Sequence, residues 1–174
     1  MLTANAKNLL ACIITDATSG GAGLFPARMV NNNVGYIHNG FGNFPKSVSA
    51  NFITSANGTG VCVGSGSTPA TDGDYKLESM LTSLQGSIVK TQGVDNGKAF
   101  INFDVTITNS GSSDITISEL GYQQYVAITT NQGGSSSSAP YPVLLDRTTL
   151  QTPITIAAGD VAIIRYRISC SIGE

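Results

Sequence analysis

The chain has 174 residues, a formal net charge of −2 at pH 7, and only 11% charged residues. This length fits one domain, or one domain with an N-terminal appendage, and it is sufficient to bury a hydrophobic core. The small net charge excludes a basic surface that neutralises phosphates, so nucleic acid is not an expected partner. A surface so poor in charge is typical of extracellular proteins and of proteins covered by neighbours in an assembly.

The N-terminal residues are expected to form a short helix over residues 3–14. Thr3 is a suitable N-cap, and apolar residues follow it at helical spacing: Ala6, Leu9, Leu10, Ile13 and Ile14. A strand is the weaker alternative, because the segment ends in β-branched residues. The segment lacks the basic start and long apolar stretch of a secretory signal, and no apolar run in the chain approaches the roughly 18 residues of a membrane span. We therefore expect assembly in a cytoplasm and no membrane partner.

The segment 16–47 is predicted to be an irregular arm. It is rich in Gly and Asn, and it carries four spaced aromatic residues: Phe25, Tyr36, Phe41 and Phe44. A structureless stretch of this length is uncommon inside a compact domain, so its aromatic side chains are expected to contact a partner. These four residues are therefore candidate partner-binding residues. We divide the chain into a helix and arm over residues 1–47 and a β-domain over residues 48–174.

The clearest pattern of the sequence is an alternation of apolar and polar residues between residues 99 and 172. Apolar residues take every second position, at Ile101, Phe103, Val105 and Ile107 and again at Ala162, Ile164, Tyr166, Ile168, Cys170 and Ile172. A period of two indicates strands with one buried face. The turns between them leave no room for helices, so the sheets are predicted to be antiparallel.

Other segments add strands to this pattern. Strands are predicted at 47–54, 60–66, 86–94, 99–108, 114–120, 122–129, 143–150, 153–157 and 161–172. The low-complexity segment 131–142 is predicted to be a flexible, exposed loop. Turn signals roughly every 8–12 residues predict an all-β fold, an antiparallel β-sandwich of jelly-roll or immunoglobulin-like type. The short N-terminal helix and the extended arm precede this sandwich.

The residues that most often carry catalysis are few in this chain. His38 is the only histidine, and it lies in a turn-rich segment with no nucleophile elbow nearby. The cysteines Cys12, Cys62 and Cys170 have an odd count and no metal-like spacing, so we interpret them as structural thiols. No enzymatic activity, cofactor or metal is therefore expected.

Three acidic residues resemble a fragment of a calcium loop. Asp72, Asp74 and Glu78 provide carboxylate oxygens, but the complete loop needs more ligands and a Gly at its sixth position. We favour the alternative in which an Asp caps a short helix that begins near Tyr75.

Two pairs of charged residues lie in the predicted strands. Asp146 and Arg147 are adjacent; a cross-strand ion pair is one interpretation, and a solvated pair on a sheet face is the favoured expectation. Arg165 and Arg167 share one face of the last strand, where they are candidates for binding a partner's carboxylates. The favoured alternative is that their charges protect a strand edge from unwanted pairing.

Two segments combine strand and turn signals in a pattern that extends over about residues 61–172. The first, VCVGSGSTPATDGDYKLES, is a strand that ends in Gly-x-Gly, a Thr-Pro turn and Asp-Tyr-x-Leu-Glu. The second, ITNSGSSDITISELGY … LLDRTTLQTPITIAAGDVAIIRYRI, contains Leu-x-Arg, an apolar strand and Ala158-Gly159-Asp160. Together they resemble small β-sandwich structural proteins of tailed bacteriophages. In those proteins a Pro-Gly turn is frequent where this chain has Ala158-Gly159-Asp160. The resemblance implies a virion component and brings no catalytic residues.

The sequence thus predicts a non-enzymatic structural component of a tailed bacteriophage virion, assembled in the host cytoplasm. It would be a tail or neck ring protein or a capsid accessory protein that forms homo-oligomers and docks on other virion proteins. The alternative is a carbohydrate- or receptor-binding sandwich that uses its tip loops. The contact candidates would then be the loops 110–114 and 131–142, with Tyr141 and Tyr122 or Tyr125 nearby.

Overall fold

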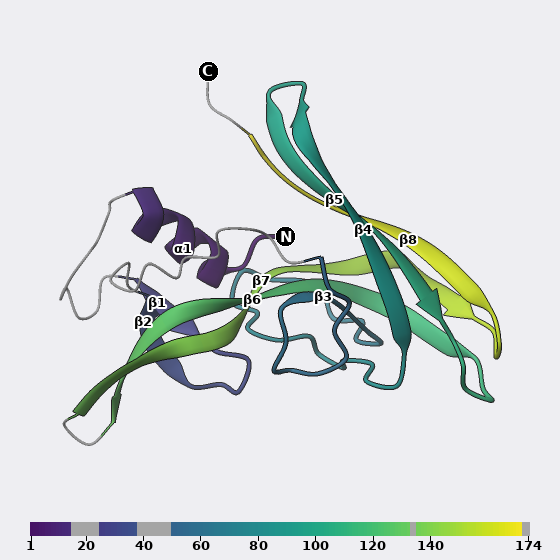
Figure 1. Cartoon of the computed structure of the whole chain (residues 1–174), viewed down its shortest axis with the longest axis horizontal. Coiled ribbons are helices and arrows are strands. Elements are labelled where there is room, and N and C mark those ends of the chain that lie inside the picture. The colour runs from purple at the N-terminus through teal and green to yellow at the C-terminus, as the bar shows by residue number, and fades with distance from the viewer. Residues whose placement is uncertain (15–24, 38–49, 133–134, 172–174) are drawn as a thin grey trace.

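The computed structural model describes residues 1–14, 25–37, 50–132 and 135–171, and it is an all-β antiparallel sandwich with a short N-terminal helix (Figure 1). The helix is α1 (Ala4–Ile14). The large sheet contains β1 (Pro26–Arg28), β2 (Val34–Ile37), β3 (Gly60–Gly64), β6 (Ile115–Gln132) and β7 (Ser135–Ile156). The small sheet contains β4 (Gln85–Asp95), β5 (Lys98–Thr108) and β8 (Val161–Ser171). The fold class expected from the sequence is confirmed.

A long hairpin of β6 and β7 forms the centre of the large sheet. β7 pairs with one edge of β6 along nearly its whole length, while β3 and β2 pair with the other edge, and β1 extends the sheet beyond β2. Three predictions were wrong here. The strands expected at 114–120 and 122–129 are one strand, β6, and those expected at 143–150 and 153–157 are one strand, β7. Most of the expected loop 131–142 also belongs to β7. A hairpin partner holds the backbone extended even where the side chains have little strand propensity.

The main core lies between the two sheets. Phe103, Val105 and Ile107 of β5 are fully buried, as their alternation in the sequence predicts. Their partners come from both sheets and include Val61, Val63, Ile117, Leu120, Tyr122, Ile156, Ile164 and Tyr166. The rings of Phe103 and Tyr122 stack across the core with centroids 5.4 Å apart. Only part of the small sheet takes part in this core, because the end that holds the β4–β5 turn projects beyond the large sheet (Figure 1).

A second apolar cluster lies under α1, at the other end of the β6–β7 hairpin. It joins α1 and the β1–β2 hairpin to the large sheet through Leu9, Ala27, Met29, Ile37, Val126, Ile128 and Val143. Thr3 caps the helix, as predicted, and its hydroxyl also donates to the carbonyl of Leu144 at 2.7 Å. The Asn5 side chain exchanges two hydrogen bonds of 2.8 Å with the backbone of Arg28.

The described part of the predicted arm is therefore not irregular. Residues 25–37 contain a β-hairpin whose second strand pairs with β6. This hairpin gives no periodic signal in the sequence, because each strand has only three or four residues, too few to show a period. Residues 38–47, which include Phe41 and Phe44, lie outside the described residues.

Candidate functional site

The adjacent residues Asp146 and Arg147 of β7 are the most buried charged groups of their strand, with exposed fractions of 5% and 2%. Successive residues of a strand point to opposite faces, so the two side chains enter different environments. Asp146 lies on the face toward the small sheet, and Arg147 lies on the opposite, outer face. The predicted solvated ion pair was therefore wrong: both groups are buried, and they do not pair with each other.

Arg147 is the centre of an ionic cluster on the outer face of the large sheet. Its Nε donates to Oε2 of Glu119 at 2.8 Å, and its Nη1 donates to Oδ2 of Asp74 at 2.8 Å. Its Nη2 donates to the backbone carbonyl of Thr68 at 3.2 Å. Burial lowers the pKa of Arg147, but the hydrogen bonds to Asp74 and Glu119 outweigh burial and raise the pKa above its usual value. The guanidinium group is therefore a permanent cation that joins three segments of the chain.

Glu119 of β6 is fully buried, and each of its carboxylate oxygens is hydrogen-bonded. In addition to Arg147, it accepts backbone N–H bonds from Gly66 at 3.2 Å, Glu78 at 3.1 Å and Ser79 at 2.8 Å. These donors belong to the segment between β3 and β4, residues 65–84, which we call the outer loop. A buried carboxylate is tolerated only when it is paired and hydrogen-bonded, and Glu119 meets both conditions. The cluster fastens the outer loop to the sheet.

Two of the three acidic residues of the outer loop, Asp74 and Glu78, belong to the same cluster. Asp74 accepts from Arg147 and from the backbone N–H and hydroxyl of Thr71, and Glu78 accepts from the backbone N–H and hydroxyl of Thr68. Asp72 pairs instead with Lys7, at 3.1 Å. Within the described residues, no group of three His, Cys, Asp or Glu side chains is arranged to hold a metal ion. The helix expected near Tyr75 does not form either, since the segment consists of turns and bends.

Hydrogen bonding shifts the pKa values of these two carboxyl groups downward. Burial raises the pKa of Asp74, but the hydrogen bonds from Arg147 and Thr71 outweigh it and hold the pKa below the usual 3.8. The hydrogen bonds from Thr68 hold the pKa of Glu78 below its usual 4.5. Both groups are therefore ionised at neutral pH, which suits salt bridges and not proton donation.

On the inner face, Asp146 joins β7 to the small sheet. It accepts a short hydrogen bond from the hydroxyl of Tyr166 on β8, and the amino group of Met1 lies 3.1 Å from its carboxylate. Burial raises the pKa of Tyr166 well above 10, with the charge of Asp146 as the next cause, so the hydroxyl keeps its proton and donates it in this bond. Burial likewise raises the pKa of the Cys62 thiol, which is consequently not a nucleophile at neutral pH.

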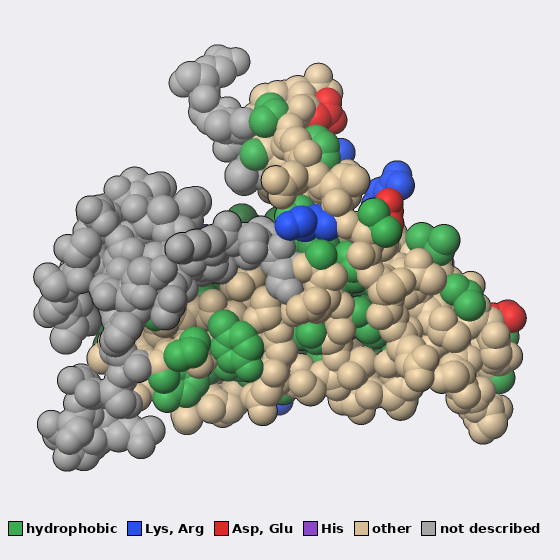
Figure 2. Space-filling model, in the orientation of Figure 1, with side chains coloured by type: hydrophobic (Ala, Val, Ile, Leu, Met, Phe, Trp, Pro, Cys, Tyr) green, Lys and Arg blue, Asp and Glu red, His purple; other side chains and the backbone are tan. Residues whose placement is uncertain are grey.

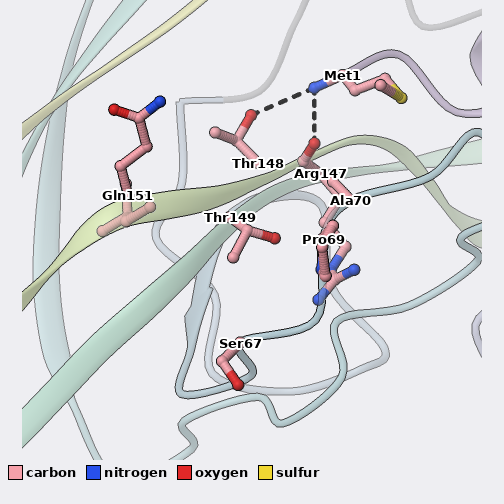
Figure 3. A pocket seen from close by; sticks show the side chains of 9 residues that line it. Met1, Ser67, Pro69, Ala70, Arg147, Thr148, Thr149 and Gln151 are labelled. Atoms are coloured by element: carbon pink, nitrogen blue, oxygen red, sulfur yellow. Dashed lines mark hydrogen bonds between the residues drawn. The ribbon is translucent and has the colours of Figure 1, made fainter.

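A cavity of about 350 Å³ lies beside Arg147 (Figure 3). Its lining residues are Met1, Ser67, Pro69, Ala70, Arg147, Thr148, Thr149, Leu150 and Gln151. The amino group of Met1 donates to the carbonyl of Arg147 at 2.6 Å and to the hydroxyl of Thr148 at 3.3 Å (Figure 3). The guanidinium of Arg147 is already engaged by the cluster, so the cavity offers hydroxyl groups without a free cation or a general base.

A larger groove of about 680 Å³ lies between the N-terminal segment and the projecting end of the small sheet. Its walls are mostly apolar, with Leu2, Ala6 and Leu9 on one side and Val94, Ala99, Ile101 and Ile168 on the other. The floor includes Tyr122 and Asp146 from the large sheet. In the described part of the chain, no strand of the large sheet covers this end of the small sheet, and the groove lies there.

The structure places four of the six predicted partner-binding residues and does not bring them together. Phe25 and Tyr36 belong to the β1–β2 hairpin and are half-buried, with Phe25 packed on the second apolar cluster. Arg165 and Arg167 lie on β8, 71% and 41% exposed in their side chains. Arg165 donates two hydrogen bonds to Asp104, at 2.7 and 3.2 Å. Phe41, Phe44 and His38 lie outside the described residues.

The tyrosines proposed for a glycan or receptor site are also dispersed. Tyr122 is 3% exposed and stacks in the main core, so it is not available to a ligand. Tyr141 packs on the second apolar cluster. Tyr125 is the most exposed of the three, at 37%, and its hydroxyl donates to the carbonyl of Asn57 at 3.1 Å. No aromatic platform is formed by these three side chains.

No protein-family model matches this chain, and neither a curated protein nor a solved structure shows significant similarity to it. In the part of the chain that the structure describes, no helix has the length and apolar character needed to cross a membrane.

Proposed function

We propose that this chain is a non-enzymatic structural component of a tailed bacteriophage virion. It would be a tail or neck ring protein or a capsid accessory protein, which forms homo-oligomers and docks on other virion proteins. The observation that carries the proposal is the ionic cluster of Arg147. It is the densest collection of charged groups in the described structure, and its contacts hold a loop on a sheet.

The two segments that resemble phage structural proteins contribute to that one cluster. Gly66, Asp74 and Glu78 come from the first segment, and Glu119 and Arg147 come from the second. Residues that are distant in sequence thus meet in one cluster. The two segments are therefore joined in one structural unit, which supports treating them as parts of one motif.

The surface also favours association over catalysis. Among the described residues, few charged side chains are seen on the face shown in Figure 2, where the tan of the backbone and of uncharged polar side chains covers most of the surface. Four large apolar side chains on the small sheet are well exposed: Val89, Val94, Val161 and Ile163. Exposed apolar residues that gather on one element are typical of contact surfaces.

The proposal is tested by asking whether the chain is part of purified particles. Particles from a culture of the encoding phage would be purified by density-gradient centrifugation and their proteins quantified by mass spectrometry. We expect the chain to sediment with the particles in several copies each, and to remain bound after a high-salt wash. If it is recovered only from the soluble lysate, the proposal is wrong.

A further inference from the structure

The small sheet has two open edges of equal length. β5 lies in the middle, with β4 and β8 on either side, and its pairing with each covers eleven residue pairs without a bulge. Among the described residues, no further strand pairs with the outer side of β4 or β8. Each edge is therefore a regular ladder of backbone groups about 36 Å long, given about 3.3 Å per residue. Such an edge is a template for another strand.

Of the features that prevent strand pairing, these edges lack proline and bulges, although β8 carries the exposed Arg165 and Arg167. Edges are commonly blocked by proline, by bulges or by rows of charged side chains. Neither β4 nor β8 contains proline. Instead, Val89 on β4 is 66% exposed, and Val161 and Ile163 on β8 are 58% and 73% exposed.

The apolar residues of the two edges share one face of the sheet. The register pairs Val89 of β4 with Asp104 of β5, and Asp104 with Arg165 of β8, so these three side chains lie on the same face. Val161 and Ile163 lie on that face too, because they are separated from Arg165 by even numbers of residues. The face points away from the core, so a sheet that extends the plane at the β4 edge would lie beside Val89, and one that extends it at the β8 edge would lie beside Val161 and Ile163.

The charges on this face distinguish which edges fit each other. The β8 edge carries Arg165 and Arg167, whereas the charge of the β4 edge on the same face is Asp95. Within one copy, Arg165 pairs with Asp104 at 2.7 Å and Arg167 lies 3.4 Å from Asp95 across β5. Pairing β8 with a second β8 would bring arginines of two copies together, and like charges across strands are destabilising. Pairing β4 with β8 brings arginines toward an acid and valine toward isoleucine. The two edges are therefore complementary in apolar character, and their pairing avoids the contact between arginines that two β8 edges would make.

We infer that the β4 edge of one copy of this chain pairs with the β8 edge of the next copy, so that their small sheets form one continuous sheet. Both strands are antiparallel to β5, so they run in the same direction and the new pair is parallel. A contact between two different surfaces repeats from copy to copy, which generates a closed ring or a filament. The inference rests on the proposed function and deepens it by naming the surface through which copies associate.

Single-cysteine cross-linking tests which edges meet. In a full-length background with Cys12 and Cys170 replaced by serine, Val89→Cys and Ile163→Cys are made separately and treated with a short bismaleimide reagent. We expect a dimer of about twice the 18.0 kDa chain mass only when the two variants are mixed. A dimer from Ile163→Cys alone or from Val89→Cys alone shows symmetric pairing of like edges and overturns the inference.

Charge variants distinguish failure of the inference from failure of the proposed function. Val89→Lys and Ile163→Lys place a cation on each edge, and Val34→Lys on β2, at a valine 60% exposed, is the matched control. By light scattering we expect the edge variants to fall to the mass of one chain and Val34→Lys to keep the mass of the unchanged protein. If oligomers persist in both edge variants, the inferred edge pairing is wrong, whereas the proposed function is not contradicted. If the unchanged chain is a monomer at every concentration, homo-oligomerisation and the inference are both wrong.

Discussion

Arg147 and Arg165 form ion pairs of similar geometry in opposite environments. The side chain of Arg147 is 3% exposed and its partner Glu119 is fully buried, whereas the side chains of Arg165 and Asp104 are 71% and 31% exposed. A solvated pair contributes little, because water screens the attraction and two long side chains lose freedom. Breaking a buried pair leaves an uncompensated charge away from water. The two arginines therefore differ in their contribution to stability, although the N···O distances of their ion pairs are almost equal.

Replacing Arg147 by methionine should strongly destabilise the fold. Arg147→Met leaves the Glu119 carboxylate buried without its cation, and the free energy of unfolding should fall by about 3–5 kcal/mol. Urea denaturation followed by circular dichroism measures this change. Arg165→Met is the matched control and should have little effect. The double variant Glu119→Gln/Arg147→Met should recover part of the loss, and equal losses in the two single arginine variants would contradict the role given to the cluster.

The carboxyl group of Asp74 should make stability depend on acid pH. Its folded pKa lies below 3.8, so the unfolded state binds a proton first as the pH falls. The stabilisation is fully present above the usual pKa and is lost as the pH falls through the folded pKa. Urea midpoints measured from about pH 6 to about pH 2 should therefore decrease, and less steeply for Asp74→Asn. Asp72→Asn, which removes an exposed ion pair, is the control; a profile unchanged in Asp74→Asn would contradict this assignment.

At the scale of elements, the ionic cluster attaches the outer loop to the sheet, and two glycines leave the space for this close contact. A Cβ atom on Gly64 would lie 2.6 Å from the carbonyl oxygen of Ser79, and one on Gly66 would lie 2.5 Å from Cβ of Glu78. Neither distance is possible without a shift of the backbone. The Gly-x-Gly sequence thus provides the space in which the loop approaches Glu119.

Alanine at these glycines should weaken the attachment of the outer loop. Gly64→Ala should lower the free energy of unfolding by about 1–3 kcal/mol, as overpacking of a filled site does. Gly73→Ala in the same loop is the control, because the nearest atom to its Cβ would be 3.8 Å away. Thermal melting compares the two variants. Similar melting temperatures would show that the loop tolerates displacement and would argue against a tight contact.

The elements that sequence reasoning predicted are those with a local signal. Phe103, Val105 and Ile107 alternate within one strand, so their burial could be read from neighbouring residues alone. The cluster had no such signal, since Arg147 is 28 residues from Glu119 and 73 from Asp74 along the chain. Residues 135–142 of β7 were not predicted as a strand for a related reason. Their extended conformation depends on pairing with β6, and their composition gives no strand signal.

At the scale of the molecule, the sandwich is closed at one end and open at the other. The large sheet and half of the small sheet enclose the main core, while the projecting half faces the apolar groove (Figure 1). The α1 helix and the β1–β2 hairpin cover the far end of the large sheet. Removing residues 1–47 would therefore expose Leu9's apolar neighbours Val126 and Ile128, so such a truncation does not test assembly cleanly. Point variants on the open edges test it better.

The most direct test of the account is a cryo-electron microscopy reconstruction of the purified particle or of the purified oligomer. We predict a symmetric array of copies in which β4 of each copy lies one strand spacing, about 4.8 Å, from β8 of its neighbour. The outer loop should remain on its own sheet, with Arg147 against Glu119. An array joined through other surfaces, or a particle without this chain, would contradict the account.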